Sequence, residues 1–411
     1  MPFTYPDDST RTTLLRAAEI HGLPLYAYDM ATIRSQHQRF VRAFNTPKLR
    51  IHYAMKALSN FTILQHMRKL GLRIDAVSIG EVLKARAAGF QPDDILFTPS
   101  GVSPDEYERA IRERVRINID NLDALEYFGV HHPNIPVGIR INPHVMGGGH
   151  SKISVGHIDS KFGISIHQLP LVHRLVQSLH MHIAGIHMHT GSDILDTQVF
   201  LRASDILFDV ARQFEDLQYL DFGSGFKVAY HPNDIETDID ELGRHFTQKF
   251  EAFCSSYGKE LELIFEPGKF LVSQAGYFLV RVNWIKQTTS TRFALIDSGF
   301  NHFIRPMFYG AHHEIINLTN PDGKPRVYTV AGYICETDTF AVNRLLPEVR
   351  PGDILCFLNA GAYGYVMSSQ YNTRPRPAEV LIDRGEINLI NPAESWEELW
   401  QREMQVRVNS S

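Results

Sequence analysis

Lys56 lies in the segment Tyr-Ala-Met-Lys-Ala, directly after an apolar run at residues 49–54 that has the composition of a buried strand. A lysine with apolar neighbours loses hydration, so the pKa of its ammonium falls and its neutral amine becomes nucleophilic. Such an amine can form a Schiff base with a carbonyl compound. A lysine at this place is more often a solvated surface residue, but the neighbours Met55 and Leu58 favour the reactive interpretation.

Two glycine-containing segments could bind an anion. In Asp-Phe-Gly-Ser-Gly (221–225), the glycines allow backbone N–H groups to approach a phosphate closely, although a plain turn has the same composition. In His-Met-His-Thr-Gly-Ser-Asp (187–193), Ser192 could donate to a phosphate or cap a helix. His187 and His189 would share one face of a strand, but one such pair among 20 histidines is weak support for a metal site, and we predict none.

Three further segments carry side chains that could take part in catalysis or binding. Glu266 ends an apolar run before a Pro-Gly turn, where it could pair with a protonated ring nitrogen or remain a solvated carboxylate. Lys269 follows in the same segment and would lie near any phosphate. Cys335 precedes Glu336 in a β-like segment, where a lone cysteine is usually a small buried hydrophobic residue. Arg305 stands four residues before a tyrosine in Arg-Pro-Met-Phe-Tyr.

Between about residues 48 and 270, short apolar runs alternate with longer segments whose apolar residues recur every three or four positions. The runs are 49–54, 73–78, 94–99, 116–119, 136–142, 183–189, 217–222 and 261–266. Eight strand–helix units over about 220 residues predict a TIM-like (β/α)8 barrel, with an open doubly wound sheet as the alternative. In such a barrel, active-site groups lie at the carboxyl ends of the strands, as the residues above do.

After about residue 272 the texture changes to short alternating runs broken by Gly, Pro, Asn and Asp, which is typical of an antiparallel sheet. We therefore predict a barrel over residues 30–271, and an all-β domain from residues 1–29 and 272–411 that contributes to the active site. The segment after Pro392 is expected to form one short helix with a loose end.

The composition excludes several classes of protein. The 411 residues include 41 basic and 46 acidic side chains, a net charge of −5 that gives little attraction to nucleic acid or anionic membranes. No apolar stretch is long enough for a spanning helix, and the first twenty residues lack the basic and apolar regions of a signal peptide. Three scattered cysteines fit neither a disulfide framework nor a zinc site, so we expect a reduced, cytoplasmic protein.

Taken together, these segments resemble the fold-type III pyridoxal-phosphate-dependent decarboxylases. The resemblance runs in order along nearly the whole chain. It rests on YAMKALSN, DAVSIGEVLKA, RINPH, SKFGI, GIHMHTGSD, DFGSGF, EPGKFLV, RPMFYGAHH, CETDTF and GAYGYVMSSQYNTRPRPAEVL. Within the family, they are most similar to the branch that converts meso-2,6-diaminopimelate to L-lysine and CO₂, the last step of lysine biosynthesis.

The resemblance implies a role for each matching residue in the barrel. Lys56 would carry pyridoxal 5′-phosphate as a Schiff base, and His189 would stack on its ring. Glu266 would keep the ring nitrogen protonated, so that the ring can accept the electrons left when CO₂ departs. The residues implied to bind the phosphate end of the cofactor are Ser192, Gly225, Gly268, Lys269 and Tyr363.

The resemblance also implies roles in the second domain and a shared active site. Cys335, supplied by the neighbouring subunit of a homodimer, would protonate the carbon that lost CO₂. Glu336 would bind the distal amino group of the substrate. Arg305 and Tyr309 would bind the distal carboxylate, with Lys269 and Tyr363 also contacting the substrate. The family usually has arginine where Lys269 stands, so the bidentate geometry of that corner differs here.

Other functions stay open at this stage. A decarboxylase of ornithine, arginine or carboxynorspermidine shares the fold, but Arg305 with Tyr309 suits a second carboxylate. A racemase of this fold would lack the Cys-Glu motif. From other classes, a metal-dependent hydrolase would use His187 and His189, and a non-catalytic carrier of pyridoxal phosphate would consist of a barrel alone.

Overall fold

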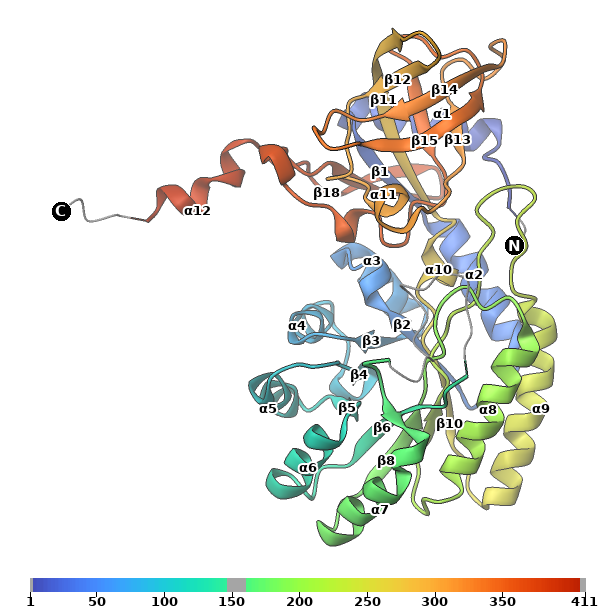
Figure 1. The fold of residues 1–411 in the computed structure, drawn as a ribbon, viewed down its shortest axis with the longest axis vertical. Helices are drawn as coiled ribbons and strands as arrows, with labels where there is room; N and C mark the ends of the chain where they lie inside the picture. Colours follow the sequence, from blue (N-terminus) through green and yellow to red (C-terminus); the bar gives the residue numbers. More distant parts are fainter. Residues whose placement is uncertain (1–2, 146–159, 407–411) are drawn as a thin grey trace. The chain divides into compact units, whose positions relative to one another are not determined.

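Two units, each built around its own sheet, make up the chain in the computed structural model (Figure 1). The structure describes residues 3–145 and 160–406. The barrel unit comprises residues 35–228 and 235–270. The β-sheet unit comprises residues 1–34, 229–234 and 271–411. The short segment 229–234, which interrupts the barrel unit in sequence, therefore groups with the β-sheet unit.

Eight parallel strands form the barrel, and pairing of β5 with β6 closes it. These strands are β2 (Leu49–Ala54), β3 (Arg73–Ala76), β4 (Ile95–Phe97), β5 (Arg116–Ile119), β6 (Val137–Asn142), β8 (Ile183–His187), β9 (Tyr219–Asp221) and β10 (Glu262–Phe265). The two-residue strand β7 (Ile164–Ser165) pairs with β6. Each barrel strand lies inside one of the predicted runs, so the predicted (β/α)8 barrel is confirmed.

Helices follow the barrel strands and lie outside them (Figure 1). They are α3 (Phe61–Lys69), α4 (Ile79–Ala87), α5 (Pro104–Glu113), α6 (Leu122–His131), α7 (Leu169–Ser178), α8 (Thr197–Ala211) and α9 (Ile239–Tyr257), preceded by α2 (Met30–Ala43). Short 3₁₀ turns occupy Met55–Ala57, Pro92–Asp94 and Ile166–Gln168. Asn60, Ser78 and Asn121 each accept a backbone N–H at the start of the next helix, which ends the loop and fixes where the helix begins.

Side chains fill the interior of the barrel, where Tyr219 is buried. The Tyr219 ring leans against Gly185, where a Cβ atom would lie 2.2 Å from the ring. Its hydroxyl donates to Asn118 Oδ1 at 2.7 Å, and Asn118 Nδ2 donates to Thr98 Oγ1 at 3.1 Å. Glycine at position 185 leaves the space that a tyrosine needs inside the barrel, and the hydrogen-bond chain satisfies the buried polar groups.

Glu262, at the amino end of β10, marks the opposite end of the barrel from Glu266. Its carboxylate accepts from Arg50 Nε at 3.2 Å, Arg73 Nη1 at 3.0 Å and Arg116 Nη1 at 3.0 Å. These arginines come from β2, β3 and β5, so one partly buried carboxylate ties four strands together. Interactions at this end of a (β/α)8 barrel serve stability, whereas catalytic residues lie at the carboxyl ends of the strands.

The β-sheet unit is one nine-stranded sheet, antiparallel except for the pairs β1–β17 and β12–β14. Its strands are β1 (Leu25–Asp29), β11 (Gly276–Gln287), β12 (Arg292–Ile296), β13 (Ile315–Asn317), β14 (Arg326–Ala331), β15 (Thr339–Leu346), β16 (Ile354–Phe357), β17 (Ala378–Asp383) and β18 (Glu386–Asn391). Helix α1 (Asp8–His21) packs its Leu14 face on a core that includes Leu279, Leu358 and Val380. The antiparallel texture expected after residue 272 is therefore present.

Short helical pieces complete the chain. They are α10 (Lys269–Val272), α11 (Arg305–Tyr309), the 3₁₀ turns Tyr365–Met367, Tyr371–Thr373 and Glu397–Leu399, and α12 (Gln401–Met404). The segment after Pro392 thus holds a 3₁₀ turn followed by one helical turn, where one short helix was expected. Among the described residues, no helix has both the length and the apolar character needed to cross a membrane.

Candidate active site

Lys56 lies just beyond the carboxyl end of β2, in the 3₁₀ turn that follows it. Its ammonium Nζ is 3.3 Å from Oδ2 of Asp75, which is buried on the neighbouring strand β3. Burial raises the pKa of Asp75 to about 7, with a further rise from Glu266 and an opposing effect of Lys56. A carboxyl group that titrates near neutrality beside Lys56 Nζ can exchange a proton with it under working conditions.

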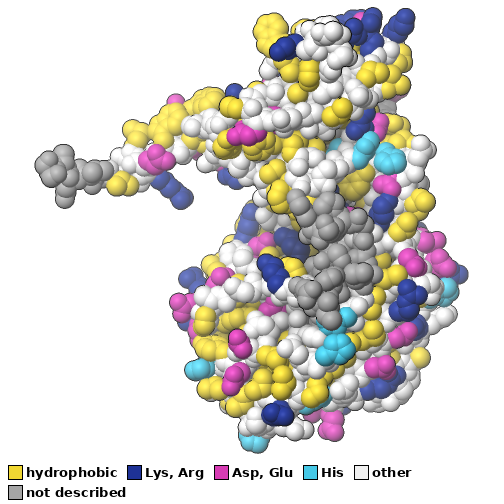
Figure 2. All heavy atoms as spheres, viewed as in Figure 1, with side chains coloured by type: hydrophobic (Ala, Val, Ile, Leu, Met, Phe, Trp, Pro, Cys, Tyr) yellow, Lys and Arg dark blue, Asp and Glu magenta, His cyan; other side chains and the backbone are white. Residues whose placement is uncertain are grey.

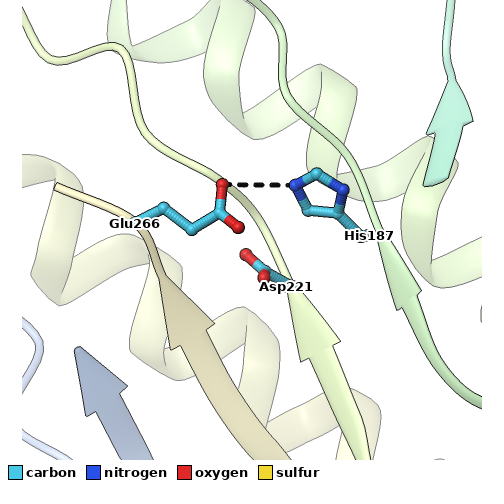
Figure 3. Close-up of side chains that lie close together, drawn as sticks. All are labelled: His187, Asp221 and Glu266. Atoms are coloured by element: carbon cyan, nitrogen blue, oxygen red, sulfur yellow. Dashed lines mark hydrogen bonds and ion pairs between the residues drawn. The ribbon is translucent and has the colours of Figure 1, made fainter. Parts of the chain in front are cut away.

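Glu266, His187 and Asp221 come together at the carboxyl ends of β10, β8 and β9 (Figure 3). One potential ligand atom from each lies within 4.8 Å of the others, and all three side chains are buried. His187 Nε2 is 3.3 Å from Glu266 Oε2, while Glu266 Oε1 has no hydrogen-bond partner among the described residues. Glu266 Oε1 thus lies beside the carboxyl group of Asp221 and receives no hydrogen bond from an amide, hydroxyl or ring N–H of the described residues.

The charge of this cluster is concentrated on Glu266. Burial acts to raise the pKa of Glu266, but the nearby His187 and Lys56 outweigh it and hold that pKa well below its usual range. Burial, and then the charge of Glu266, raise the pKa of Asp221 well above its usual range. The pKa values of the two carboxyl groups are thus shifted in opposite directions, and the negative charge of the pair is favoured on Glu266.

His189 lies two residues beyond the end of β8, in the loop that leads to α8. Its Nδ1 accepts the backbone N–H of Ser224 at 3.3 Å. Burial, followed by the positive charges of Arg140 and Lys56, lowers the pKa of His189 to about 3. The ring is therefore neutral at physiological pH and held in one orientation, which suits stacking on a flat aromatic ligand.

The loop after β8 and the glycine turn after β9 are in direct contact. Ile194 N–H donates to the carbonyl of Gly225 at 2.8 Å, and a Cβ atom on Gly225 would lie 2.1 Å from the carbonyl of Gly191. Gly225 has a φ of +120°, which only glycine adopts readily. Ser192 stands between these contacts on the first loop, so Ser192 and Gly225, two of the five residues predicted at the phosphate end, lie at one place at the barrel mouth.

Lys269 follows Gly268 at the start of α10. Its ammonium forms an ion pair with Asp193, directly after Ser192, and the lysine side chain is 12% exposed. A Cβ atom at Gly268 would lie 3.0 Å from the Cβ of Ala57, so the turn after β10 packs closely against the turn that carries Lys56. The carboxylate of Asp193 thus balances the positive charge of Lys269. The sequence has a lysine in place of the usual arginine but predicted no partner for it.

In the β-sheet unit, Arg305 is buried and its guanidinium lies near three tyrosine rings. The guanidinium carbon is 5.7 Å from the ring centre of Tyr309 and 5.9 Å from that of Tyr363, the two tyrosines predicted to act with it. The third ring is that of Tyr230, at 5.6 Å. Tyr363 has a φ of +56°, a conformation that is uncommon outside glycine and that occurs more often at functional sites.

Cys335 and Glu336 form a separate group in the same unit. Cys335 is an exposed free thiol, and its Sγ lies 3.6 Å from the side-chain nitrogen of Asn372. Glu336 accepts a hydrogen bond from the hydroxyl of Tyr371. The predicted cysteine is therefore not the small buried hydrophobic residue that a β segment usually contains, since its thiol faces solvent.

Comparison with known proteins identifies the family to which a chain with this fold belongs. The family described as "Pyridoxal-dependent decarboxylase, pyridoxal binding domain" matches residues 30–273, more than half of the chain. The chain belongs to the family of pyridoxal-dependent decarboxylases.

Three relatives with the same name are similar to this chain over nearly its whole length. The diaminopimelate decarboxylase of Methanothermobacter thermautotrophicus is 39% identical, with 93% of this chain and 92% of the relative covered. A crystal structure of diaminopimelate decarboxylase superposes with a TM-score of 0.91 at 34% identity, covering 98% of this chain and 99% of the other. The Helicobacter pylori enzyme, solved in complex with L-lysine, has a TM-score of 0.88 at 30% identity, with 95% and 99% covered.

Several residues of the site were not among those predicted. Asp75 and Asp221 are the buried acids beside Lys56 and Glu266, and Asp193 is the partner of Lys269. Asp75 could have been noticed as a charged residue inside an otherwise apolar strand. The others gain their role only from pairing between loops of different strands, which residue spacing along the chain does not report.

Proposed function

We propose that this chain removes one carboxylate of meso-2,6-diaminopimelate as CO₂ and releases L-lysine, with pyridoxal 5′-phosphate as cofactor. The observation that carries the proposal is that Lys56 and the buried Glu266, whose pKa is held low, lie at the same mouth of the barrel. Relatives across nearly the full length, named for the same reaction, support it. Bound pyridoxal phosphate supplies an aldehyde that condenses with an amine and a protonated ring that accepts an electron pair.

The barrel residues fit this cofactor in three respects. Glu266 Oε1, buried and without a partner among the described residues, would accept the N–H of the protonated ring. The neutral His189 ring would stack on the face of the cofactor. The touching glycine loops at Gly191 and Gly225, with Ser192 between them, would bind the phosphate through N–H and hydroxyl donors. We also propose that Gly268, Lys269 and Tyr363 act at this phosphate end.

Lys56 would use its Nζ both to bind the cofactor and to move protons. Asp75 would take a proton from the ammonium at 3.3 Å, leaving the neutral amine that Schiff-base formation requires. When the substrate amine takes its place, Lys56 Nζ would be released beside Asp75 and regain the proton. The pKa of Asp75 near 7 allows this exchange in both directions.

The β-sheet unit would bind the far end of the substrate. Arg305, with Tyr309, would hold the distal carboxylate, and Glu336 the distal amino group. Cys335 Sγ would deliver a proton to the carbon from which CO₂ has left, so that one C–C bond breaks and one C–H bond forms. These roles make the domain of residues 1–29 and 272–411 part of the active site of the barrel domain at 30–271.

We propose a homodimer in which each subunit supplies Cys335 to its neighbour. Cys335 is exposed within its own unit, as the donor to a partner would be. Hydrophobic side chains are also exposed along the carboxyl-terminal segment, visible in Figure 2. They include Leu389, Trp396, Trp400, Met404 and Val406. Exposed apolar surface of this kind marks an interface between proteins. We also propose the cytoplasm as the compartment, where cysteines that form no disulfide, such as Cys335, stay reduced.

Dilution tests the shared site. Below the dissociation constant of the dimer, activity per chain should fall toward zero, because a monomer lacks the partner's proton donor. The measurement is CO₂ release per chain over a dilution series, with light scattering at each concentration. Constant activity per chain while scattering reports monomers would contradict the shared site.

The substrate is tested by supplying purified protein and pyridoxal phosphate with meso-diaminopimelate, ornithine, arginine or carboxynorspermidine in separate reactions. We expect CO₂ and L-lysine from meso-diaminopimelate alone, because a buried arginine suits a second carboxylate that the plain diamino acids lack. Release from ornithine or arginine at a similar rate would favour the related decarboxylases. Bound cofactor with no CO₂ from any substrate would favour a non-catalytic carrier.

Metal removal tests the hydrolase alternative. His187, Asp221 and Glu266 have the composition of a divalent cation site, although the predicted pair, His187 with His189, does not form it. Dialysis against a strong chelator, followed by pyridoxal phosphate, should leave CO₂ release unchanged. If activity is lost and only added metal restores it, the cluster binds a metal, and the assignment of Glu266 to the cofactor is wrong.

A further inference from the structure

His313, eight residues after Arg305, contacts the guanidinium of Arg305 in the β-sheet unit. Arg305 Nε donates to His313 Nε2 at 3.2 Å, and both side chains are buried. On the other side of the imidazole, Nδ1 lies 2.9 Å from the carbonyl oxygen of Leu358. A carbonyl oxygen can only accept, so Nδ1 carries the hydrogen and Nε2 offers its lone pair to Arg305.

The neutral form of His313 is the form that this geometry requires. Burial, followed by the positive charge of Arg305, lowers the pKa of His313 well below its usual value. The imidazole is therefore uncharged at physiological pH and remains an acceptor for Arg305 Nε. An imidazolium would have no lone pair to offer and would repel the guanidinium.

A second contact holds the same edge of the guanidinium. Arg305 Nη2 donates to the hydroxyl of Tyr230 at 3.2 Å, and Ser273 Oγ lies 3.1 Å from that hydroxyl. Nε and Nη2 form one edge of the planar guanidinium, and Nη1 with the other hydrogen of Nη2 forms the next edge. Within the described part of the chain, the hydrogen bonds of Arg305 use only the first edge, which leaves the second for a carboxylate.

We infer that His313 is a positioning residue that fixes Arg305, so that its Nη1–Nη2 edge binds the distal carboxylate of the substrate in a bidentate manner. The inference rests on the proposed function of Arg305. A long arginine side chain loses considerable rotamer freedom on binding, and prior fixation reduces that loss. His313 would thereby contribute to selection of substrates that carry a second carboxylate.

Two substitutions at this position separate the two hydrogen bonds of the imidazole. In His313→Gln, the amide oxygen can occupy the place of Nε2 and still accept from Arg305 Nε. In His313→Asn, the amide nitrogen can occupy the place of Nδ1 and still donate to Leu358, but the acceptor for Arg305 is lost. The two variants are of similar polarity, so they differ chiefly in the bond that the inference concerns.

The measurement compares two inhibitors in holoenzyme. L-Lysine retains the distal carboxylate, and cadaverine has no carboxylate. For His313→Asn we expect the inhibition constant of L-lysine and the KM for meso-diaminopimelate to rise about tenfold, the scale set by one hydrogen bond to a charged group. The inhibition constant of cadaverine and kcat should change less than about threefold. His313→Gln should stay within about threefold of the unchanged protein throughout.

Each outcome has a distinct meaning. If the unchanged protein releases no CO₂ from meso-diaminopimelate, the proposed function fails. If it is active and His313→Asn retains full affinity for L-lysine, the inference is overturned. Equal losses for L-lysine and cadaverine would show a structural role only, and would overturn the inference too.

If His313→Asn does not fold, as judged by circular dichroism, Tyr230→Phe tests the second contact. A rise of about threefold for L-lysine alone supports the inference, and no change overturns it.

Discussion

Lys56→Ala is expected to abolish CO₂ release and to remove the visible absorption that a Schiff base between Lys56 and pyridoxal phosphate gives. Lys56 Nζ lies 3.3 Å from Asp75 Oδ2. In the part of the chain that the structure describes, no other lysine forms an ion pair with Asp75. Loss of a covalently acting group lowers kcat by about 10³-fold or more. The measurements are the absorption spectrum of the variant with added cofactor and its rate of CO₂ release.

Lys69→Ala supplies the matched control. Lys69 is exposed at the end of α3, the helix that follows the Lys56 turn, and a change there should leave the spectrum and the rate unaltered. Circular dichroism of Lys56→Ala should match that of the unchanged protein, because removing an ammonium from a largely solvated position has little effect on packing. A variant that keeps both absorption and activity would remove Lys56 from its assigned role.

The barrel could be predicted because its strands obey a local rule. A strand buried on both faces reads as a continuous apolar run, as in Leu263-Ile264-Phe265, and eight such runs alternated with amphipathic segments. Polar residues placed directly after those runs also indicated the site, because the carboxyl ends of all the strands meet at one end of a barrel. Lys56, His189 and Glu266 were predicted as site residues in this way.

The partners of those residues could not be found by the same rule. Burial, and then the charge of Glu266 at the end of the next strand, raise the pKa of Asp221, and Lys269 forms an ion pair with Asp193, 76 positions away. Tyr230 illustrates the limit most clearly. It lies inside the sequence span of the barrel, but its segment groups with the β-sheet unit and its hydroxyl accepts from Arg305. Such pairings depend on how loops fold in space, and sequence spacing does not encode them.

Glu266→Gln is expected to lower kcat by roughly 10- to 150-fold, the rate equivalent of about 1.5–3 kcal/mol for one hydrogen bond to a charged group. A neutral amide no longer holds the ring nitrogen of the cofactor in its protonated form, so the ring becomes a weaker electron acceptor. Visible absorption should persist, since Lys56 is unchanged. The measurements are kcat for meso-diaminopimelate and the absorption spectrum. Loss of activity with retained absorption would separate this residue's role from that of Lys56.

Glu262→Gln, four residues earlier on the same strand, should have a different effect. Glu262 binds Arg50, Arg73 and Arg116 at the amino end of the barrel, so its change should reduce the free energy of unfolding by about 1–2 kcal/mol and leave kcat unaltered. Glu266→Gln also removes a carboxylate whose charge its neighbours stabilise more than burial opposes it, so it too should reduce the free energy of unfolding, and kcat is the quantity that separates the two variants. Denaturant unfolding and kcat, measured on both variants, test this contrast. Equal effects of the two changes on kcat would mean that Glu266 acts on the barrel as a whole rather than on the cofactor.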